Sequence, residues 1–122
     1  MIRIKRAYDP TLKADGARVL VDRLWPRGCT KEALELRSWA KAVTPSPDLR
    51  KAFHSGALTF AAFSERYRQE LALPEAREGL DELAALADLG TLTLITANRD
   101  EAQNHALVLK AALEAHLKKE QP

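Results

Sequence analysis

Short apolar runs along the chain predict three β-strands. Ile2 and Ile4 alternate with basic residues, which indicates a strand that is buried on one face and ends near Tyr8. A second strand is predicted over residues 18–24, where three apolar residues follow one another. A third is predicted over residues 91–96, a segment rich in β-branched side chains.

Elsewhere, apolar residues recur every three or four positions, as on the buried face of a helix. We predict helices over 31–42, over 48–54, around the apolar positions of 60–71, after the interruption at Pro74 to about Leu89, and over 100–118. Ser46 followed by Pro47 is a good helix start, since serine caps a helix and proline suits its first turn. The connecting segments are short and contain proline or glycine.

This order of elements predicts an α/β fold with a small, mostly parallel sheet of about three strands, covered by helices on both faces. The chain of 122 residues is expected to form one domain, 1–122, with a frayed tail at 119–122. The connection between the first two strands, about ten residues, is short for a parallel crossover. These two strands are therefore antiparallel or not neighbours.

Composition indicates an ordinary globular protein, with 46% hydrophobic and 30% charged residues. The sequence contains no apolar run of membrane-spanning length and no secretion signal, so we expect a cytoplasmic protein that does not bind membranes. A single cysteine, Cys29, excludes an internal disulfide. The net charge of +2 is uneven: residues 1–56 carry a net +6 and residues 57–122 a net −4. This asymmetry is typical of an anion-binding face or of a dipole between subunits, unless it is only an accident of surface composition.

Polar side chains follow the second and third predicted strands. The second strand leads into Asp22, Arg23, Trp25, Arg27 and Gly28, and the third into Thr96, Asn98, Arg99 and Asp100. If the two strands are parallel neighbours, both groups face one crevice, where α/β proteins bind ligands. Arginine suits phosphate or carboxylate groups, so the crevice is predicted to bind an anion. Further candidate ligands are Lys41, Arg50 and Asn104.

Each of these residues also has a purely structural interpretation. Asp22 and Arg23 could pair with neighbouring charges, and Trp25 could cover the core. Asp100 and His105 are candidates for moving a proton, but Asp100 with Gln103 also forms a capping box. Three widely separated histidines and the lack of a glycine-rich phosphate loop predict no metal and no nucleotide cofactor. A nucleophilic role for Cys29 is disfavoured, because no phosphatase-type Cys-x5-Arg loop is present.

The chain resembles a known family over residues 2–115. The resemblance is carried by RVLVDRLWPRG at 18–28, WAK at 39–41, PS at 45–46, LRKAF at 49–53, FSERYRQEL at 63–71, RD at 99–100 and NHA at 104–106. These motifs are similar to those of the domain of unknown function 488 family (YeaO-like proteins). The resemblance implies a small bacterial or archaeal α/β protein, with no settled activity, cofactor or substrate.

The family motif maps onto the positions singled out above and adds Tyr67. Its positions here are Arg23, Trp25, Arg27, Gly28, Lys41, Arg50, Tyr67, Asp100, Asn104 and His105. Family members often have a tyrosine and a small residue where this chain has Thr96 and Asn98. Cys29 stands where an aliphatic residue is more usual.

Three functions are compatible with the sequence. The favoured one is a small-molecule protein, enzyme or sensor, that binds a phosphorylated or nucleotide-like anion at the strand ends. The basic N-terminal half could instead bind nucleic acid, with Trp25 and Trp39 as stacking platforms. The third is a non-catalytic interaction module in which oppositely charged halves form a homodimer. The sequence alone does not decide whether a reaction is catalysed.

Overall fold

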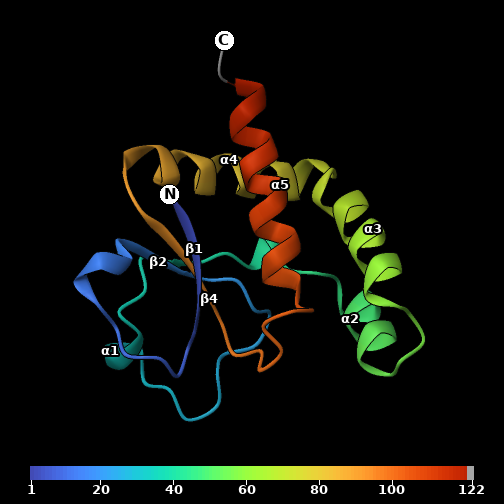
Figure 1. The fold of residues 1–122 in the computed structure, drawn as a ribbon, viewed down its shortest axis with the longest axis horizontal. Helices are drawn as coiled ribbons and strands as arrows, with labels where there is room; N and C mark the ends of the chain where they lie inside the picture. Colours follow the sequence, from blue (N-terminus) through green and yellow to red (C-terminus); the bar gives the residue numbers. More distant parts are fainter. Residues whose placement is uncertain (121–122) are drawn as a thin grey trace.

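A four-stranded parallel sheet with helices packed against it forms the computed structural model, which describes residues 1–120 (Figure 1). The strands are β1 (Ile2–Arg6), β2 (Ala17–Leu20), β3 (Ser38–Trp39) and β4 (Leu92–Thr96). Their order in the sheet is β1-β4-β2-β3, and every neighbouring pair is parallel. The predicted α/β class is thus confirmed, and β1 and β2 are not neighbours because β4 lies between them.

Within residues 1–120, five α-helices and two 3-10 turns accompany the strands, and α5 follows the last of them. The helices are α1 (Lys31–Leu34), α2 (Pro47–His54), α3 (Phe60–Leu71), α4 (Pro74–Leu89) and α5 (His105–Glu120), and the 3-10 turns are η1 (Lys13–Asp15) and η2 (Lys41–Val43). The side chains of Thr30, Ser46 and Thr59 cap α1, α2 and α3, each accepting a bond from a first-turn amide. Of the predicted frayed tail, 119–120 belong to α5, and 121–122 lie outside the described residues.

The predicted helix over 31–42 is wrong beyond its first turn. Glu35 has a φ of 46°, a left-handed conformation that ends α1 after four residues. The chain then runs extended, and the amide of Arg37 donates to the carbonyl of Arg18 at 2.7 Å. The spacing of Leu34, Leu36 and Trp39 suits a helix. Pairing with β2 instead makes residues 38–39 the strand β3, which was not predicted.

The second strand and the last helix are also shorter at one end than predicted. β2 ends at Leu20, so residues 21–24 belong to the loop that follows it. α5 begins at His105 and not at Asp100, because the preceding residues form a separate turn. Both shifts lengthen the loops at the carboxyl end of the sheet.

Alternate residues of the strands bury two separate hydrophobic clusters. Val19, Val21 and Leu94 point to one face of the sheet, where they pack against α2, α3, α4 and α5. Leu20 and Ile95 point to the other face, where Leu34 of α1 and the flanking loops cover them. Both faces are thus covered, but all of the long helices lie on one.

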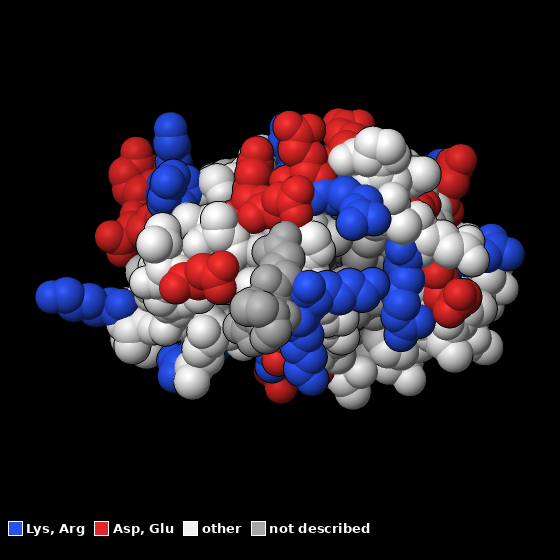
Figure 2. Space-filling view, turned by 90° about the horizontal axis from the view of Figure 1, so that it is seen from above, with Lys and Arg blue, Asp and Glu red and all other residues white. Residues whose placement is uncertain are grey.

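The surface carries mixed charge over the ends of α4 and α5. On the face shown in Figure 2, lysines and arginines are interspersed with aspartates and glutamates. No helix in the part of the chain that the structure describes is long and apolar enough to cross a membrane.

Candidate functional site

A cavity of about 670 Å³ lies at the carboxyl ends of β2 and β4. Three segments surround it: the loop after β2, the helix α2, and the loop between β4 and α5. Its polar and aromatic lining consists of Tyr8, Asp22, Arg23, Trp25, Arg27, Arg50, Phe53, His54, Asn98, Arg99, Asp100, Gln103 and His105. Because β2 and β4 are parallel neighbours, the two polar strand ends meet, as the sequence predicted.

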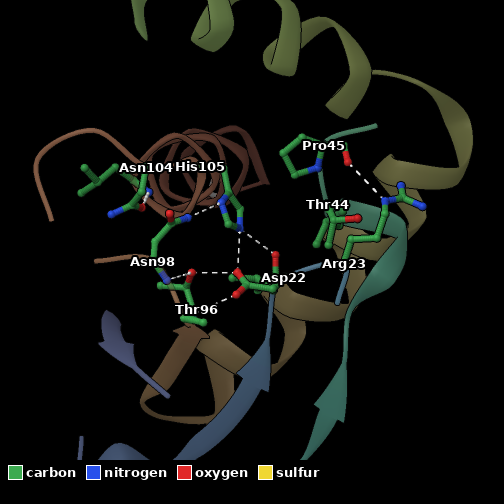
Figure 3. A network of polar contacts seen from close by, with 12 residues as sticks. Asp22, Arg23, Thr44, Pro45, Thr96, Asn98, Asn104 and His105 are labelled. Atoms are coloured by element: carbon green, nitrogen blue, oxygen red, sulfur yellow. Dashed lines mark hydrogen bonds and ion pairs between the residues drawn. The ribbon is translucent and has the colours of Figure 1, made fainter. Parts of the chain in front are cut away.

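Asp22 connects the two strand ends and the last helix at the base of this cavity (Figure 3). Its carboxylate accepts a hydrogen bond from the Thr96 hydroxyl at 2.7 Å and from the Ala97 amide at 2.8 Å. Nε2 of His105 lies 3.1 Å from Oδ1 of the same carboxylate. Asp22 thus holds the start of the β4–α5 loop and the first residue of α5 against the end of β2.

These contacts keep Asp22 ionised. Burial by itself would raise the pKa of the Asp22 carboxyl group. The hydrogen bonds from His105, Ala97 and Thr96 outweigh burial and lower the pKa below its usual 3.8. The charged form of Asp22 is therefore the form that the fold stabilises at neutral pH.

The lowered pKa predicts that Asp22 makes stability depend on pH in the acid range. A carboxyl group with a lowered pKa in the folded state stabilises the protein fully above its unfolded pKa, and this contribution is lost as the pH falls through the folded value. We expect the free energy of unfolding, measured by urea denaturation, to fall below about pH 3.8. Asp15 has a lowered pKa as well, so Asp22→Asn should reduce this slope and not remove it. An unchanged slope in Asp22→Asn would contradict the prediction.

Both ring nitrogens of His105 contact protein groups. Nδ1 lies 3.2 Å from the amide nitrogen of Asn98, so it accepts, and Nε2 then carries the proton. Nε2 is shared between Asp22 and the carbonyl oxygen of Val21, 2.8 Å away. The imidazole is thereby fixed between β2 and the β4–α5 loop, with no ring nitrogen directed at the cavity alone.

The loop after β2 is held by its aromatic residues. The indole N–H of Trp25 donates to the carbonyl of Cys29 at 2.8 Å, and the Trp25 ring meets the Trp39 ring edge-on at 5.5 Å. The indole N–H of Trp39 donates to the Asp22 carbonyl at 2.6 Å. On the other side, the Tyr8 hydroxyl donates to the carbonyl of Arg27 at 3.0 Å. The loop is therefore tied to both β1 and β3.

Four arginines reach the cavity from all three surrounding segments. Arg23 and Arg27 come from the loop after β2, Arg50 from α2 and Arg99 from the loop after β4. Arg23 donates through Nε to the carbonyl of Pro45 at 3.3 Å, which fixes its side chain next to the start of α2 (Figure 3). No ion pair within the part of the chain described here engages any of the four.

Six of the nine site residues predicted from the sequence line this cavity. These are Arg23, Trp25, Arg27, Arg50, Asp100 and His105. The Asp100 carboxylate accepts the amide hydrogens of Ala102 and Gln103, which shapes the turn before α5. Asp100 therefore forms a local turn here and does not begin the helix.

The other three predicted residues lie outside the cavity lining. The Lys41 ammonium lies over the Trp39 ring, 4.1 Å from its centre. Asn104 is buried and caps α5: Oδ1 accepts from the Leu107 amide at 3.1 Å, and Nδ2 donates to the Asp100 carbonyl at 2.7 Å. Gly28 lies in the turn after Arg27. All three support the loops that form the site.

Three further lining residues were not predicted from the sequence, namely Tyr8, Phe53 and His54, whereas Arg99 was expected there as part of a polar strand end. A signal for two of them was present: Arg50, Phe53 and His54 are spaced by three and four residues, so they share one face of α2. Tyr8 follows β1, and its place in the site depends on β1 pairing with β4. Among the described residues, no three His, Cys, Asp or Glu side chains are grouped as metal ligands would be.

Similarity to known proteins identifies the family of this chain. The model of the family described as the inactive DUF488-N3 subclade matches residues 1–122. The chain belongs to this DUF488 subclade. The uncharacterized protein YeaO of Escherichia coli is 51% identical over 108 residues, which cover 88% of this chain and 92% of the relative. The uncharacterized protein Rv3073c of Mycobacterium tuberculosis is 39% identical over 112 residues, 92% of each chain.

The DUF488 assignment confirms the resemblance inferred from the sequence motifs. The family assignment does not supply an activity, because the subclade is described as inactive and the relatives as uncharacterized. No solved structure matches this DUF488 chain. Any function must therefore be argued from the cavity.

Proposed function

We propose that this protein binds a small phosphorylated anion in the cavity between β2, α2 and the β4–α5 loop, and that it does so without catalysing a reaction. The observation that carries the proposal is the convergence of Arg23, Arg27, Arg50 and Arg99 on one cavity. Guanidinium groups bind phosphate through paired hydrogen bonds, and a cavity concentrates their field. A volume of about 670 Å³ is within the range of small-molecule sites.

The acidic residues of the cavity offset only part of this positive charge. The Asp22 carboxylate already accepts hydrogen bonds from Thr96 and Ala97 and contacts His105, so its oxygens are directed into the protein. One oxygen of Asp100 is likewise taken by two backbone amides. The arginines therefore remain the groups available to a ligand.

A binding role fits the contacts of His105 better than proton transfer does. A general acid or base must reach the substrate with a nitrogen or oxygen that can exchange a proton. Both ring nitrogens of His105 contact protein atoms instead. The description of the subclade as inactive agrees with a binding protein.

Nucleic-acid binding by the basic half and homodimerisation stay predictions. Four arginines gather around one open cleft, whose size favours a small ligand.

The proposal predicts that phosphate compounds raise the thermal stability of the protein. A ligand that binds only the folded state stabilises it by RT ln(1 + [L]/Kd). We expect ribose 5-phosphate and inorganic phosphate to raise Tm in differential scanning fluorimetry, relative to chloride at equal ionic strength. The double variant Arg23→Ala/Arg50→Ala should lose this shift. Arg77→Ala, on the surface of α4 and outside the cavity lining, should keep it.

Two results would count against the proposal. One is a wild-type Tm that neither phosphate compound raises beyond the chloride control. The other is an equal loss in Arg77→Ala and in the double variant, which would indicate a general charge effect.

A further inference from the structure

We propose that the ligand of this cavity is a phosphomonoester attached to an aromatic heterocycle, the chemistry of a nucleoside 5′-monophosphate. The inference rests on the proposed function and adds to it a second, aromatic part of the ligand. It is carried by Trp25 and Phe53, which line the same cavity as the arginines and come from two different segments, the loop after β2 and α2. The same chemistry occurs in a free mononucleotide and at the phosphorylated 5′ end of a nucleic acid strand.

Charge in the cavity matches a phosphomonoester. Four arginines and two aspartates line it, which leaves an excess of two positive charges with the histidines neutral. A phosphomonoester carries about −1.5 to −2 at pH 7. A single group of this kind therefore balances the cavity, whereas a longer polyphosphate would exceed it.

Trp25 presents an exposed aromatic surface, and the one polar atom of its ring already has a hydrogen-bond partner within the protein. Its indole N–H donates to the Cys29 carbonyl at 2.8 Å, so the ring needs no hydrogen bond from a ligand. The edge-on contact with Trp39 fixes its orientation, yet 37% of Trp25 is exposed, and the adjacent Leu24 is 61% exposed. A rigid, partly exposed indole at the edge of a cationic cavity is suited to stack on a heterocyclic base.

The contacts of Trp39 show how the indole of Trp25 is held in place. Trp39 lies under the Lys41 ammonium at 4.1 Å and donates to the Asp22 carbonyl at 2.6 Å. Asp22 in turn belongs to the network at the cavity base. The aromatic platform and the base of the cavity are thus parts of one rigid assembly, which lowers the entropy cost of binding.

Along α2, a cation and an aromatic ring of the cavity lining lie one turn apart. Arg50 and Phe53 are three residues apart, so their side chains lie on the same helix face. Phe53 stacks on Phe63 with ring centres 4.5 Å apart and an angle of 23°, which fixes it from the side of α3. A ligand that spans from Arg50 to the aromatic residues must therefore be anionic at one end and flat and apolar at the other.

The test compares ligands that differ by one part. Isothermal titration calorimetry would measure adenosine 5′-monophosphate, cytidine 5′-monophosphate, ribose 5-phosphate and adenosine against the wild type. We expect the two nucleotides to bind about tenfold or more tightly than ribose 5-phosphate, from base stacking, and adenosine to bind far more weakly than its monophosphate. Trp25→Ala should abolish the advantage of the nucleotides while it keeps ribose 5-phosphate binding, and Trp25→Phe should retain part of it.

The outcomes separate this inference from the proposed function. If ribose 5-phosphate binds and the nucleotides bind no more tightly, the aromatic part of the inference is overturned and anion binding stands. If no phosphate compound binds, the proposed function itself fails. If Trp25→Ala does not fold, quenching of wild-type tryptophan fluorescence by adenosine 5′-monophosphate, but not by ribose 5-phosphate, takes its place, and an absence of selective quenching overturns the inference.

A further pair of ligands distinguishes the two sources of the same chemistry. A short single-stranded oligonucleotide would be compared with and without a 5′ phosphate. Tighter binding of the phosphorylated strand than of the mononucleotide identifies a strand end as the ligand. Tighter binding of the mononucleotide identifies a free nucleotide. Equal binding of both strands, each at least as tight as the mononucleotide, overturns the proposal, because the phosphate then contributes nothing to binding.

Discussion

Replacing Asp22 with alanine is expected to lower the free energy of unfolding by about 3 kcal/mol. The substitution leaves the Thr96 hydroxyl and the Ala97 amide without their acceptor and removes the carboxylate from His105. The cost is at the lower end for a broken buried pair, because Nε2 of His105 retains its contact with the Val21 carbonyl. For a chain of this length we expect Tm to fall by roughly 10 °C, measured by circular dichroism.

Asp81→Ala is the matched control for this variant. Asp81 also contacts a histidine, with Nε2 of His116 at 2.7 Å, but the Asp81 side chain is 62% exposed. Exposed pairs of this kind contribute little to stability, so Asp81→Ala should cost less than about 1 kcal/mol. Equal losses in the two variants would show that Asp22 is not the structural centre of the site.

Asp22→Ala should also affect the binding site. The carboxylate holds the β4–α5 loop, which carries Arg99, against the loop after β2, which carries Arg23 and Arg27. Without it, the two loops are free to move apart. We therefore expect weaker stabilisation by phosphate than in the wild type, even at temperatures where the variant is folded.

Gly16→Ala is expected to cost about 3–4 kcal/mol, at the opposite end of the sheet. Gly16 has a φ of +64°, which L-residues rarely adopt, and a Cβ atom would lie 2.3 Å from the carbonyl oxygen of Thr91. The Thr91 oxygen accepts a hydrogen bond from the Ala17 amide at 3.0 Å, which is the first contact between β2 and β4. Neither of the two segments can therefore move away without breaking this hydrogen bond. Urea denaturation of the variant would measure the loss.

Gly56→Ala separates the two causes of this effect. Gly56 also has a positive φ, +83°, but nothing lies within 4 Å of its Cβ position. Only the backbone strain should remain, about 1–2 kcal/mol. If Gly16→Ala lowers the free energy of unfolding no more than Gly56→Ala does, the close approach to Thr91 is not the reason for glycine at position 16.

Local signals were sufficient for much of the helical structure. Ser46 before Pro47 predicted the start of α2, and the spacing of Phe60, Phe63 and Tyr67 predicted the buried face of α3. These features depend on residues a few positions apart, so the sequence records them directly. The family was likewise recognisable from the motif at 18–28, and the family model confirms it.

The errors occurred where contacts distant in sequence decide the structure. The segment after Leu34 has a spacing that suits a helix, but pairing with β2 makes Ser38–Trp39 a strand. Asn104 was expected to lie one turn into the last helix and to reach the crevice, whereas the late start of α5 makes it a helix cap. Lys41 is drawn to the Trp39 ring, a contact that depends on the same strand.

The sequence by itself thus determined the family, the α/β class and the presence of two polar strand ends. Only the tertiary structure decided that β4 lies between β1 and β2, which brings Tyr8, Arg27 and Arg99 to one cavity. The physical reason is that periodicity and capping act within one or two turns of chain. Strand order and the partners of Asp22 depend on which apolar faces pack together across the whole domain.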